Sequence, residues 1–106
     1  MPDHAPPFTI GVEEEYLLVD VDTRAVANDP PPELFSALHD RTEGRAFPEF
    51  LRSQIEVATP VCRTIGEARA SLTGLRQAVV EESARFGLAP IAAASHPFSL
   101  SSTQKR

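Results

Sequence analysis

The residues from Phe8 to Asp20, read as FTIGVEEEYLLVD, constrain the fold more than any other part of the chain. Apolar side chains lie on both sides of three consecutive glutamates, and the run contains no basic residue. In an extended strand, alternate side chains share a face. Glu13 and Glu15 therefore project together with Gly11, about 7 Å apart along the backbone, as the rise per residue requires. Glu14 projects from the opposite face, which is more apolar.

This pair of carboxylates has two interpretations. Two like charges held so close repel each other unless a cation lies between them. Carboxylate oxygens are typical ligands of divalent cations, and Gly11 leaves space for a ligand beside them. Alternatively, the glutamates belong to an edge strand, where charges prevent pairing with another chain. Strand geometry alone leaves both interpretations open.

The composition limits the class of protein. With 106 residues, 42% of them hydrophobic and 24% charged, the chain suits one small globular domain. The net charge of −5 argues against a nucleic acid or an anionic membrane as partner. Cys62 is the single cysteine, which excludes an internal disulfide and a thiolate zinc cluster; a packed, small apolar role is expected. We expect a cytoplasmic protein, because no run approaches ~18 apolar residues and MPDHAPP is not a signal sequence.

A turn and a short helix are expected after the first strand. The polar residues 20–23 favour a turn, and Val26 is a candidate for a short return strand. Pro31 or Pro32 suits the first turn of a helix that ends near Asp40. The apolar side of this helix consists of Leu34, Phe35 and Leu38.

Residues 46–59, AFPEFLRSQIEVAT, are expected to form a second strand that ends at Pro60. Apolar and polar side chains alternate in its second half. One face has Leu51, Ser53, Ile55 and Val57, and the other has Arg52, Gln54, Glu56 and Ala58.

Residues 64–86 are expected to form a long helix. Thr64 and Glu67 match a capping box, and Gly87 is a typical helix stop. One apolar stripe at helical spacing contains Ile65, Ala68, Leu72, Leu75, Val79 and Phe86. Residues 88–94, LAPIAAA, follow as a short buried strand. His96 comes directly after this strand, where functional groups often lie.

These elements predict an α+β fold. The strands that begin at residues 8, 46 and 88 form one mixed or antiparallel sheet. The long helix and the short helix pack on its apolar face, and the carboxylates lie on the other face. Residues 1–7 are expected to be a flexible tail, residues 8–98 the domain, and residues 99–106 a disordered tail.

Three segments together resemble a known family: GVEEE at residues 11–15, EFLRSQIEVATPVC at residues 49–62, and HPF at residues 96–98. Their order and spacing are similar to the N-terminal part of the type 2 glutamate–cysteine ligases. These carboxylate–amine ligases belong to the glutamine synthetase-like superfamily. The resemblance covers residues 8–98 and implies a curved sheet with an open concave face. Family members have several hundred residues, so we expect a truncated N-terminal portion that lacks the ATP-binding half and is inactive alone.

The resemblance also implies a reaction, in which ATP is the co-substrate and Mg²⁺ or Mn²⁺ the cofactor. The terminal phosphoryl group of ATP passes to the side-chain carboxylate of glutamate. An amine such as cysteine then attacks the acyl phosphate and forms a γ-glutamyl amide, a step of glutathione biosynthesis. The expected partners are therefore small molecules, with a homodimer or the missing C-terminal portion as further partners. The sequence does not identify the acceptor amine.

The resemblance implies that the metal ligands are Glu13, Glu15, Glu56 and Glu49. Strand geometry agrees for Glu56, which lies on the polar face of its strand. It disagrees for Glu49, because residues seven apart fall on opposite faces. A bulge at Phe50, or a strand that begins after Glu49, would reconcile the two.

Other polar residues have weaker assignments. Arg52 and Gln54 lie on the face of Glu56 and could bind a substrate carboxylate or phosphate. His96 could contact substrate or be structural. Glu14 is expected to form an ion pair at the sheet edge with an arginine such as Arg69 or Arg76.

Two rival functions remain at this point. The chain could be a non-catalytic remnant or interaction module, whose open sheet edges would favour dimerisation. It could also be a stand-alone acidic domain that binds cations.

Overall fold

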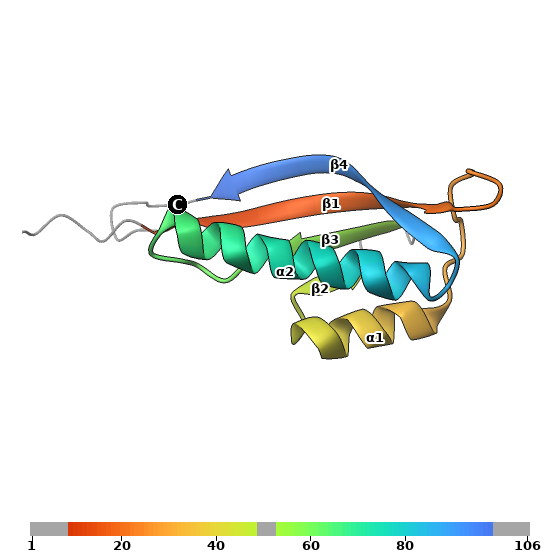
Figure 1. Ribbon diagram of the computed structural model, residues 1–106, viewed down its shortest axis with the longest axis horizontal. Helices are drawn as coiled ribbons and strands as arrows, with labels where there is room; N and C mark the ends of the chain where they lie inside the picture. The colour runs from red at the N-terminus through yellow and green to blue at the C-terminus, as the bar shows by residue number, and fades with distance from the viewer. Residues whose placement is uncertain (1–8, 49–52, 99–106) are drawn as a thin grey trace, which may run out of the picture.

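The computed structural model describes residues 9–48 and 53–98. They form a four-stranded antiparallel sheet, in the order β2-β3-β1-β4, and two helices (Figure 1). The elements are β1 (Gly11–Asp20), α1 (Pro32–Thr42), β2 (Ala46–Pro48), β3 (Gln54–Ala58), α2 (Ile65–Ala84) and β4 (Leu88–Phe98). The α+β fold expected from the sequence is confirmed.

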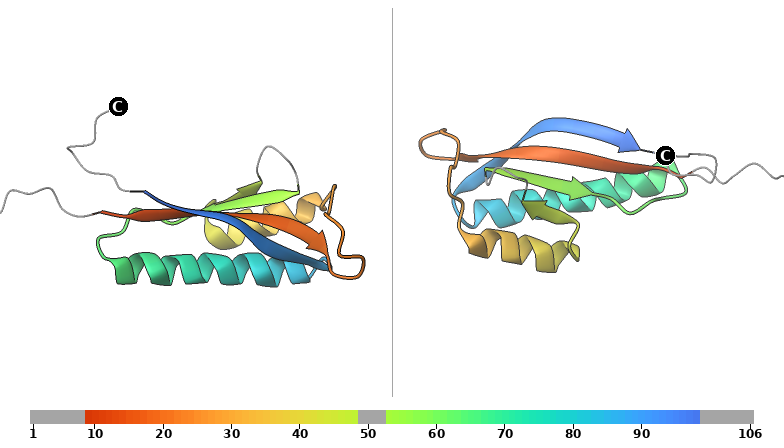
Figure 2. Two further views of the ribbon diagram at one scale, coloured as in Figure 1. Left: turned by 90° about the horizontal axis from the view of Figure 1, so that it is seen from above. Right: turned by 180° about the vertical axis from the view of Figure 1, so that it is seen from behind.

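The molecule has two layers, with α1 and α2 on the same face of the sheet (Figure 2). The opposite face is covered by no described helix, and we call it the open face. β1 lies between β3 and β4, so it is an interior strand. The alternative in which its glutamates protect a sheet edge is therefore wrong.

β1 ends in the expected turn. The Asp20 carboxylate accepts hydrogen bonds from the backbone N–H groups of Asp22, at 2.8 Å, and Thr23, at 3.0 Å. The expected return strand at Val26 is reduced to one isolated bridge with Val19. Asp20 thus closes the turn with its own side chain.

The single strand expected at residues 46–59 is wrong. β2 and β3 are two antiparallel strands of a hairpin, with Ala46 opposite Val57 and Pro48 opposite Ile55. The alternation of side chains expected in the second half is confirmed, because Ile55 and Val57 are fully buried and Gln54 is partly exposed. A period of two occurs in one long strand and in a hairpin alike, so the pattern could not separate them.

The long helix is confirmed, although α2 ends at Ala84, two residues before the expected end. The Thr64 hydroxyl accepts a hydrogen bond from the Glu67 backbone N–H at 3.0 Å. Glu67 in turn accepts one from the backbone N–H of Arg63 at 2.9 Å, one residue before the capping position. Gly87 has a φ of +73°, which suits the chain reversal into β4.

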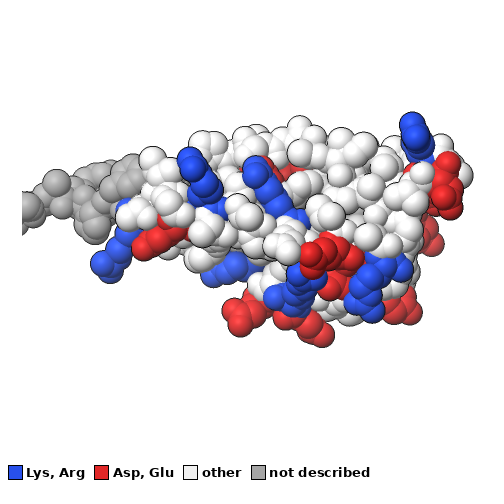
Figure 3. Space-filling model, viewed as in Figure 1, with Lys and Arg blue, Asp and Glu red and all other residues white. Residues whose placement is uncertain are grey.

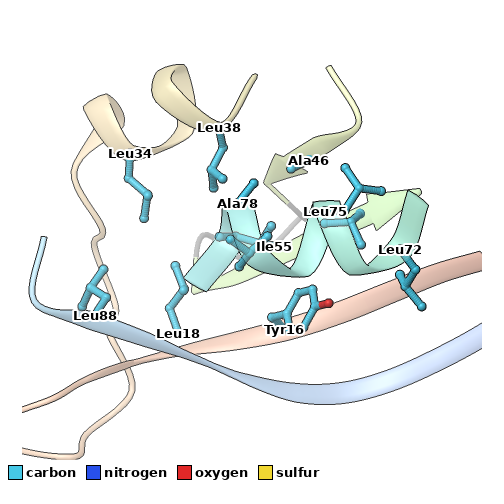
Figure 4. Packing of buried hydrophobic residues seen from close by; sticks show 12 residues of the cluster. Tyr16, Leu18, Leu34, Leu38, Ala46, Ile55, Leu72, Leu75, Ala78 and Leu88 are labelled. Carbon is cyan, nitrogen blue, oxygen red and sulfur yellow. The ribbon is translucent and has the colours of Figure 1, made fainter. Parts of the chain in front are cut away.

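The core lies between the helices and the sheet (Figure 4). α1 begins as expected, with Pro31 at the N-cap and Pro32 in the first turn. The apolar stripe of α2 contributes to the core except at Ile65, the first residue of the helix, which is 60% exposed. The buried positions of α2 start at Ala68. The fully buried core side chains are Leu18, Leu34, Leu38, Ala46, Ile55, Val57 and Val79.

β4 is longer than expected. It continues through residues 95–97 to Phe98, so His96 lies inside a strand and not after its end. The extra length pairs with the first half of β1, where the glutamates lie. Antiparallel pairing with β1 supplies this extension, which the proline-containing sequence of β4 did not reveal.

Candidate functional site on the open face

Glu13 and Glu15 project from the open face, as the alternation in β1 predicted. Their neighbours Glu14 and Tyr16 are buried on the helix face, together with Leu18. Glu13 and Glu15 themselves are partly exposed. Figure 2 shows that the described helices leave this face uncovered. The alternation along β1, an interior strand, therefore presents two carboxylates to it.

Glu56 joins these two carboxylates. In the pairing of β1 with β3, Glu15 and Glu56 are direct partners. Direct partners in antiparallel strands project on the same face, with Cβ atoms about 4.5–5.5 Å apart. The structure thus brings Glu13, Glu15 and Glu56 to one face, drawn from two neighbouring strands.

Two further candidates lie on the same face. Gln54 is opposite Leu17 of β1, and His96 of β4 is opposite Glu13. His96 is exposed. Arg52 and Glu49, which were predicted as phosphate-binding and metal-binding residues, lie outside the described residues.

A β-bulge decides which face His96 takes. Tyr16 is opposite Ala92, whereas Glu15 is opposite Ala94, so Ala93 is an extra residue in β4. In a regular strand, His96 would share the face of the buried Leu88, because the two residues are eight apart. The bulge reverses the alternation and turns His96 towards the open face. Sequence reasoning missed this arrangement.

Glu14 lies directly beneath the candidate site and is 2% exposed. Arg76 of α2 holds its carboxylate with two hydrogen bonds, of which the one from Nε to Oε1 is 2.8 Å long. The Tyr16 hydroxyl donates a further hydrogen bond to Oε1. The ion pair expected for Glu14 is confirmed with Arg76, although it joins a helix to an interior strand and not to a sheet edge.

These contacts shift the pKa values of the groups that make them. The hydrogen bonds from Arg76 are the main reason why the pKa of Glu14 lies below its usual value, and burial opposes them. Burial, with the adjacent Glu14 carboxylate, raises the pKa of Tyr16. Glu14 is therefore a charged structural group that fixes β1 to α2, between Glu13 and Glu15.

The helix face has a different charge pattern. Basic and acidic side chains lie interspersed over α1 and α2, and the rim formed by β4 shows neither kind (Figure 3). Arg41 of α1 bridges Glu81 of α2, at 2.6 Å, and Glu82, at 3.0 Å. The Arg41–Glu81 pair is exposed and the Arg41–Glu82 pair is partly buried; both join the two helices and do not form a site.

Cys62 is buried, as expected. Its thiol donates a hydrogen bond to the backbone carbonyl of Pro60 at 3.3 Å. The backbone N–H of Cys62 donates a hydrogen bond to the carbonyl of Ile10, with an N to O distance of 2.7 Å. This residue contributes to packing where the chain leaves β3.

The chemistry of the open face suits a hard cation, although the ligand set is partial. Carboxylate oxygens are the ligands that Mg²⁺ prefers, and Mg²⁺ is usually bound by one or two carboxylates together with substrate phosphates. Within residues 9–48 and 53–98, no three His, Cys, Asp or Glu side chains form a cluster that could hold a metal ion. In the same residues the open face is not hollowed into a pocket. The described carboxylates would therefore share a cation with a ligand or with other residues.

Comparison with known proteins identifies the family. The family model described as glutamate–cysteine ligase family 2 (GCS2) matches residues 9–106. The chain belongs to this family. The resemblance inferred from GVEEE, the second segment and HPF is thus confirmed.

Curated relatives agree with this assignment. Proteins named "Putative glutamate–cysteine ligase 2" are 54% identical over 97 residues in Rhodospirillum rubrum and 53% identical over 91 residues in Jannaschia sp.. A relative of the same name in Chloroflexus aurantiacus is 43% identical over 99 residues. The matches cover 88%, 86% and 87% of this chain but 25%, 24% and 23% of the relatives. The chain thus spans about a quarter of the length of these family 2 proteins.

No described helix of this family 2 chain is both long and apolar enough to cross a membrane.

Proposed function

We propose that the chain contributes to an ATP-dependent carboxylate–amine ligase of the glutamate–cysteine type, with Mg²⁺ or Mn²⁺ as its cofactor. The observation that supports this function best is the pairing of Glu15 with Glu56 beside Glu13 on the open face. Within residues 9–48 and 53–98, no basic side chain forms an ion pair with Glu15 or Glu56, and like charges this close oppose folding, so a bound cation explains the pair best. Membership of family 2 supports the ligase class.

The residues of the open face would divide the work as follows. Glu13, Glu15 and Glu56 would hold the cation, and Glu49 is a further candidate. Gln54 and His96 would contact a substrate carboxylate or phosphate, as would Arg52. When bound, Mg²⁺ neutralises charge that gathers on phosphate oxygens.

The proposed reaction has two steps. The side-chain carboxylate of glutamate attacks the terminal phosphorus of ATP, so that an acyl phosphate forms and ADP leaves. The amine of cysteine, or of another acceptor, then attacks the acyl carbon, which gives an amide and releases phosphate. The chain's own contribution would be to place oxygen ligands on one sheet face, because groups that are already positioned lower the entropic part of the barrier.

The short length of the chain relative to its family members affects the activity that we expect from it. The chain spans about a quarter of its curated relatives, and the described carboxylates do not form a complete metal cluster. We therefore expect turnover from a chain extended to the length of the relatives, and none from the 106 residues alone.

The test is phosphate release that depends on glutamate, cysteine, ATP and Mg²⁺, measured on the 106-residue chain and on the extended chain. In the extended chain, Glu13→Ala, Glu15→Gln and Glu56→Gln should each reduce kcat/KM by on the order of 100-fold or more. Glu33→Gln is the matched control, because Glu33 is exposed on α1 at the helix face.

Equal activity of Glu13→Ala and the parent would refute the site. A folded extended chain that binds no Mg²⁺–ATP and releases no phosphate would favour the non-catalytic alternative.

A further inference from the structure

Two prolines in β4 occupy equivalent positions along β1. Pro90 is opposite Leu18, and Pro97 is opposite Val12. Proline has no backbone N–H and cannot donate to a sheet. Each proline therefore has to lie where β1 needs no hydrogen bond from it.

The hydrogen bonds of β1 show that both prolines meet this condition. The Leu18 N–H donates to the carbonyl of Ser53 at 2.8 Å, and the Leu18 carbonyl accepts from the N–H of Ala27 at 2.9 Å. The Val12 N–H donates to the Thr59 hydroxyl at 2.9 Å, and the Val12 carbonyl accepts from the Thr59 N–H at 2.9 Å. Both residues of β1 thus direct their backbone groups away from β4. Their partners form non-hydrogen-bonded pairs with β1, where a missing N–H leaves the ladder intact.

The spacing of the two prolines is incompatible with a regular strand. In a regular strand, backbone groups point to alternate sides with a period of two. Pro90 and Pro97 are seven residues apart, so one of them would have to face β1. Without a bulge, Pro97 would lie opposite Gly11, where one ladder hydrogen bond would be lost. The extra residue Ala93 removes this conflict.

We propose that Pro97 is a positioning residue, which together with Pro90 enforces the bulge at Ala93 and so turns His96 beside Glu13. The bulge also places Ser95 opposite Glu14, on the helix face. The importance of this orientation for catalysis rests on the proposed function of the open face. The orientation of His96 itself does not depend on that function.

The alternative register is well defined. If β4 continued without a bulge, Ser95 would lie opposite Glu13, and His96 would lie opposite Val12 on the helix face. The first half of β4 is anchored, because Leu88 is 6% exposed and belongs to the core. A change of register should therefore affect residues after Ala93, since a shift of the first half would move the buried side chain of Leu88 out of the core.

The experiment uses NMR on the 106-residue chain and three variants. In the parent, nuclear Overhauser effects should join the His96 ring to the Glu13 side chain. Pro97→Ala removes the constraint, so these contacts should weaken several-fold while contacts between Ser95 and Glu13 appear. Deletion of Ala93 alone should keep His96 beside Glu13, because the prolines are then an even number apart. Deletion of Ala93 combined with Pro97→Ala should restore the contacts that Pro97→Ala loses.

The rescue by deletion separates register from general stability, since a merely destabilised strand would not recover when a residue is removed. The proposal is overturned if Pro97→Ala retains the parent contacts, or if deletion of Ala93 alone turns His96 away. The parent spectrum tests it even if a variant does not fold, because contacts of Ser95 with Glu13 in the parent would contradict it.

Paramagnetic broadening by Mn²⁺ tests whether the orientation of His96 matters for the proposed cation site. Mn²⁺ added to the parent should broaden the signals of Glu13, Glu15 and His96, and the His96 broadening should fall in Pro97→Ala and return in the double variant. If Mn²⁺ broadens none of these signals in the parent, the proposed cation site fails. The Overhauser contacts then still decide the proposal for Pro97.

Discussion

Glu15 of β1 and Glu56 of β3 are direct cross-strand partners in the middle of the sheet. Partners at this position usually stabilise a sheet when their charges are opposite, and like charges destabilise it. The chain thus retains an arrangement that folding alone does not favour. A conflict of this kind between stability and local structure is typical of functional sites.

Glu56→Gln should stabilise the chain in the absence of divalent cations. The substitution removes the repulsion with Glu15, so the free energy of unfolding in EDTA should rise by about 0.2–1 kcal/mol at low salt. The gain should shrink as salt screens the charges. Urea denaturation at two salt concentrations measures both effects. Asp22→Asn is the control, because it changes the net charge equally at an exposed turn position. A gain as large in Asp22→Asn would show that net charge, and not the pair, is responsible.

Arg76→Ala should destabilise the chain by about 1–3 kcal/mol, because the buried Glu14 carboxylate loses its main partner. The expected loss lies below that of a fully buried pair, since the Arg76 side chain is 52% exposed. Chemical denaturation measures it. Arg69→Ala, at an exposed position of the same helix, should change stability by less than about 0.5 kcal/mol. Comparable losses in the two variants would remove the special role of Arg76.

Acid should weaken the fold, in part through Glu14. Its pKa in the folded protein lies below the usual value of 4.5, so the unfolded chain binds more protons as the pH falls. The stabilisation is fully present above pH 4.5 and is lost as the pH falls through the lower pKa of the folded state. Unfolding free energies between neutral pH and about pH 3 test this prediction. The slope should be shallower in Glu14→Gln, and an unchanged slope would contradict the assignment.

Thr64→Ala should cost about 0.5–2 kcal/mol, because the first turn of α2 loses the hydroxyl that accepts from the Glu67 N–H. Thr73→Ala is the matched control. Thr73 is exposed in the middle of the same helix. The one hydrogen bond described for its hydroxyl is donated to the backbone carbonyl of Arg69. Its replacement should be neutral or slightly stabilising. Thermal unfolding followed by circular dichroism distinguishes the two variants, and equal midpoints would argue against the cap.

The sequence predicted those features that depend on local periodicity. The alternation around Glu13 and Glu15 gave the correct face for both. The capping residue Thr64 and the apolar spacing of the helix gave α2 to within two residues at its end. Glu14 was correctly expected to pair with an arginine of α2, although only the packing of the helix on the sheet selects Arg76 over Arg69.

Features that depend on pairing between distant segments were missed. The hairpin of β2 and β3 has the same alternation as one long strand. The interior position of β1 follows from strand order, which no local pattern encodes. The orientation of His96 depends on the bulge at Ala93, yet the odd spacing of Pro90 and Pro97 was a usable signal in the printed sequence.

The two prolines of β4 have a consequence for self-association. Because their nitrogens point outward, the outer margin of β4 offers an interrupted series of donors between Leu88 and Phe98. The opposite margin is β2, which has three residues and ends in Pro48. A second molecule of this chain therefore meets a poor template on either flank, and continuous fibril-like stacking of sheets is disfavoured.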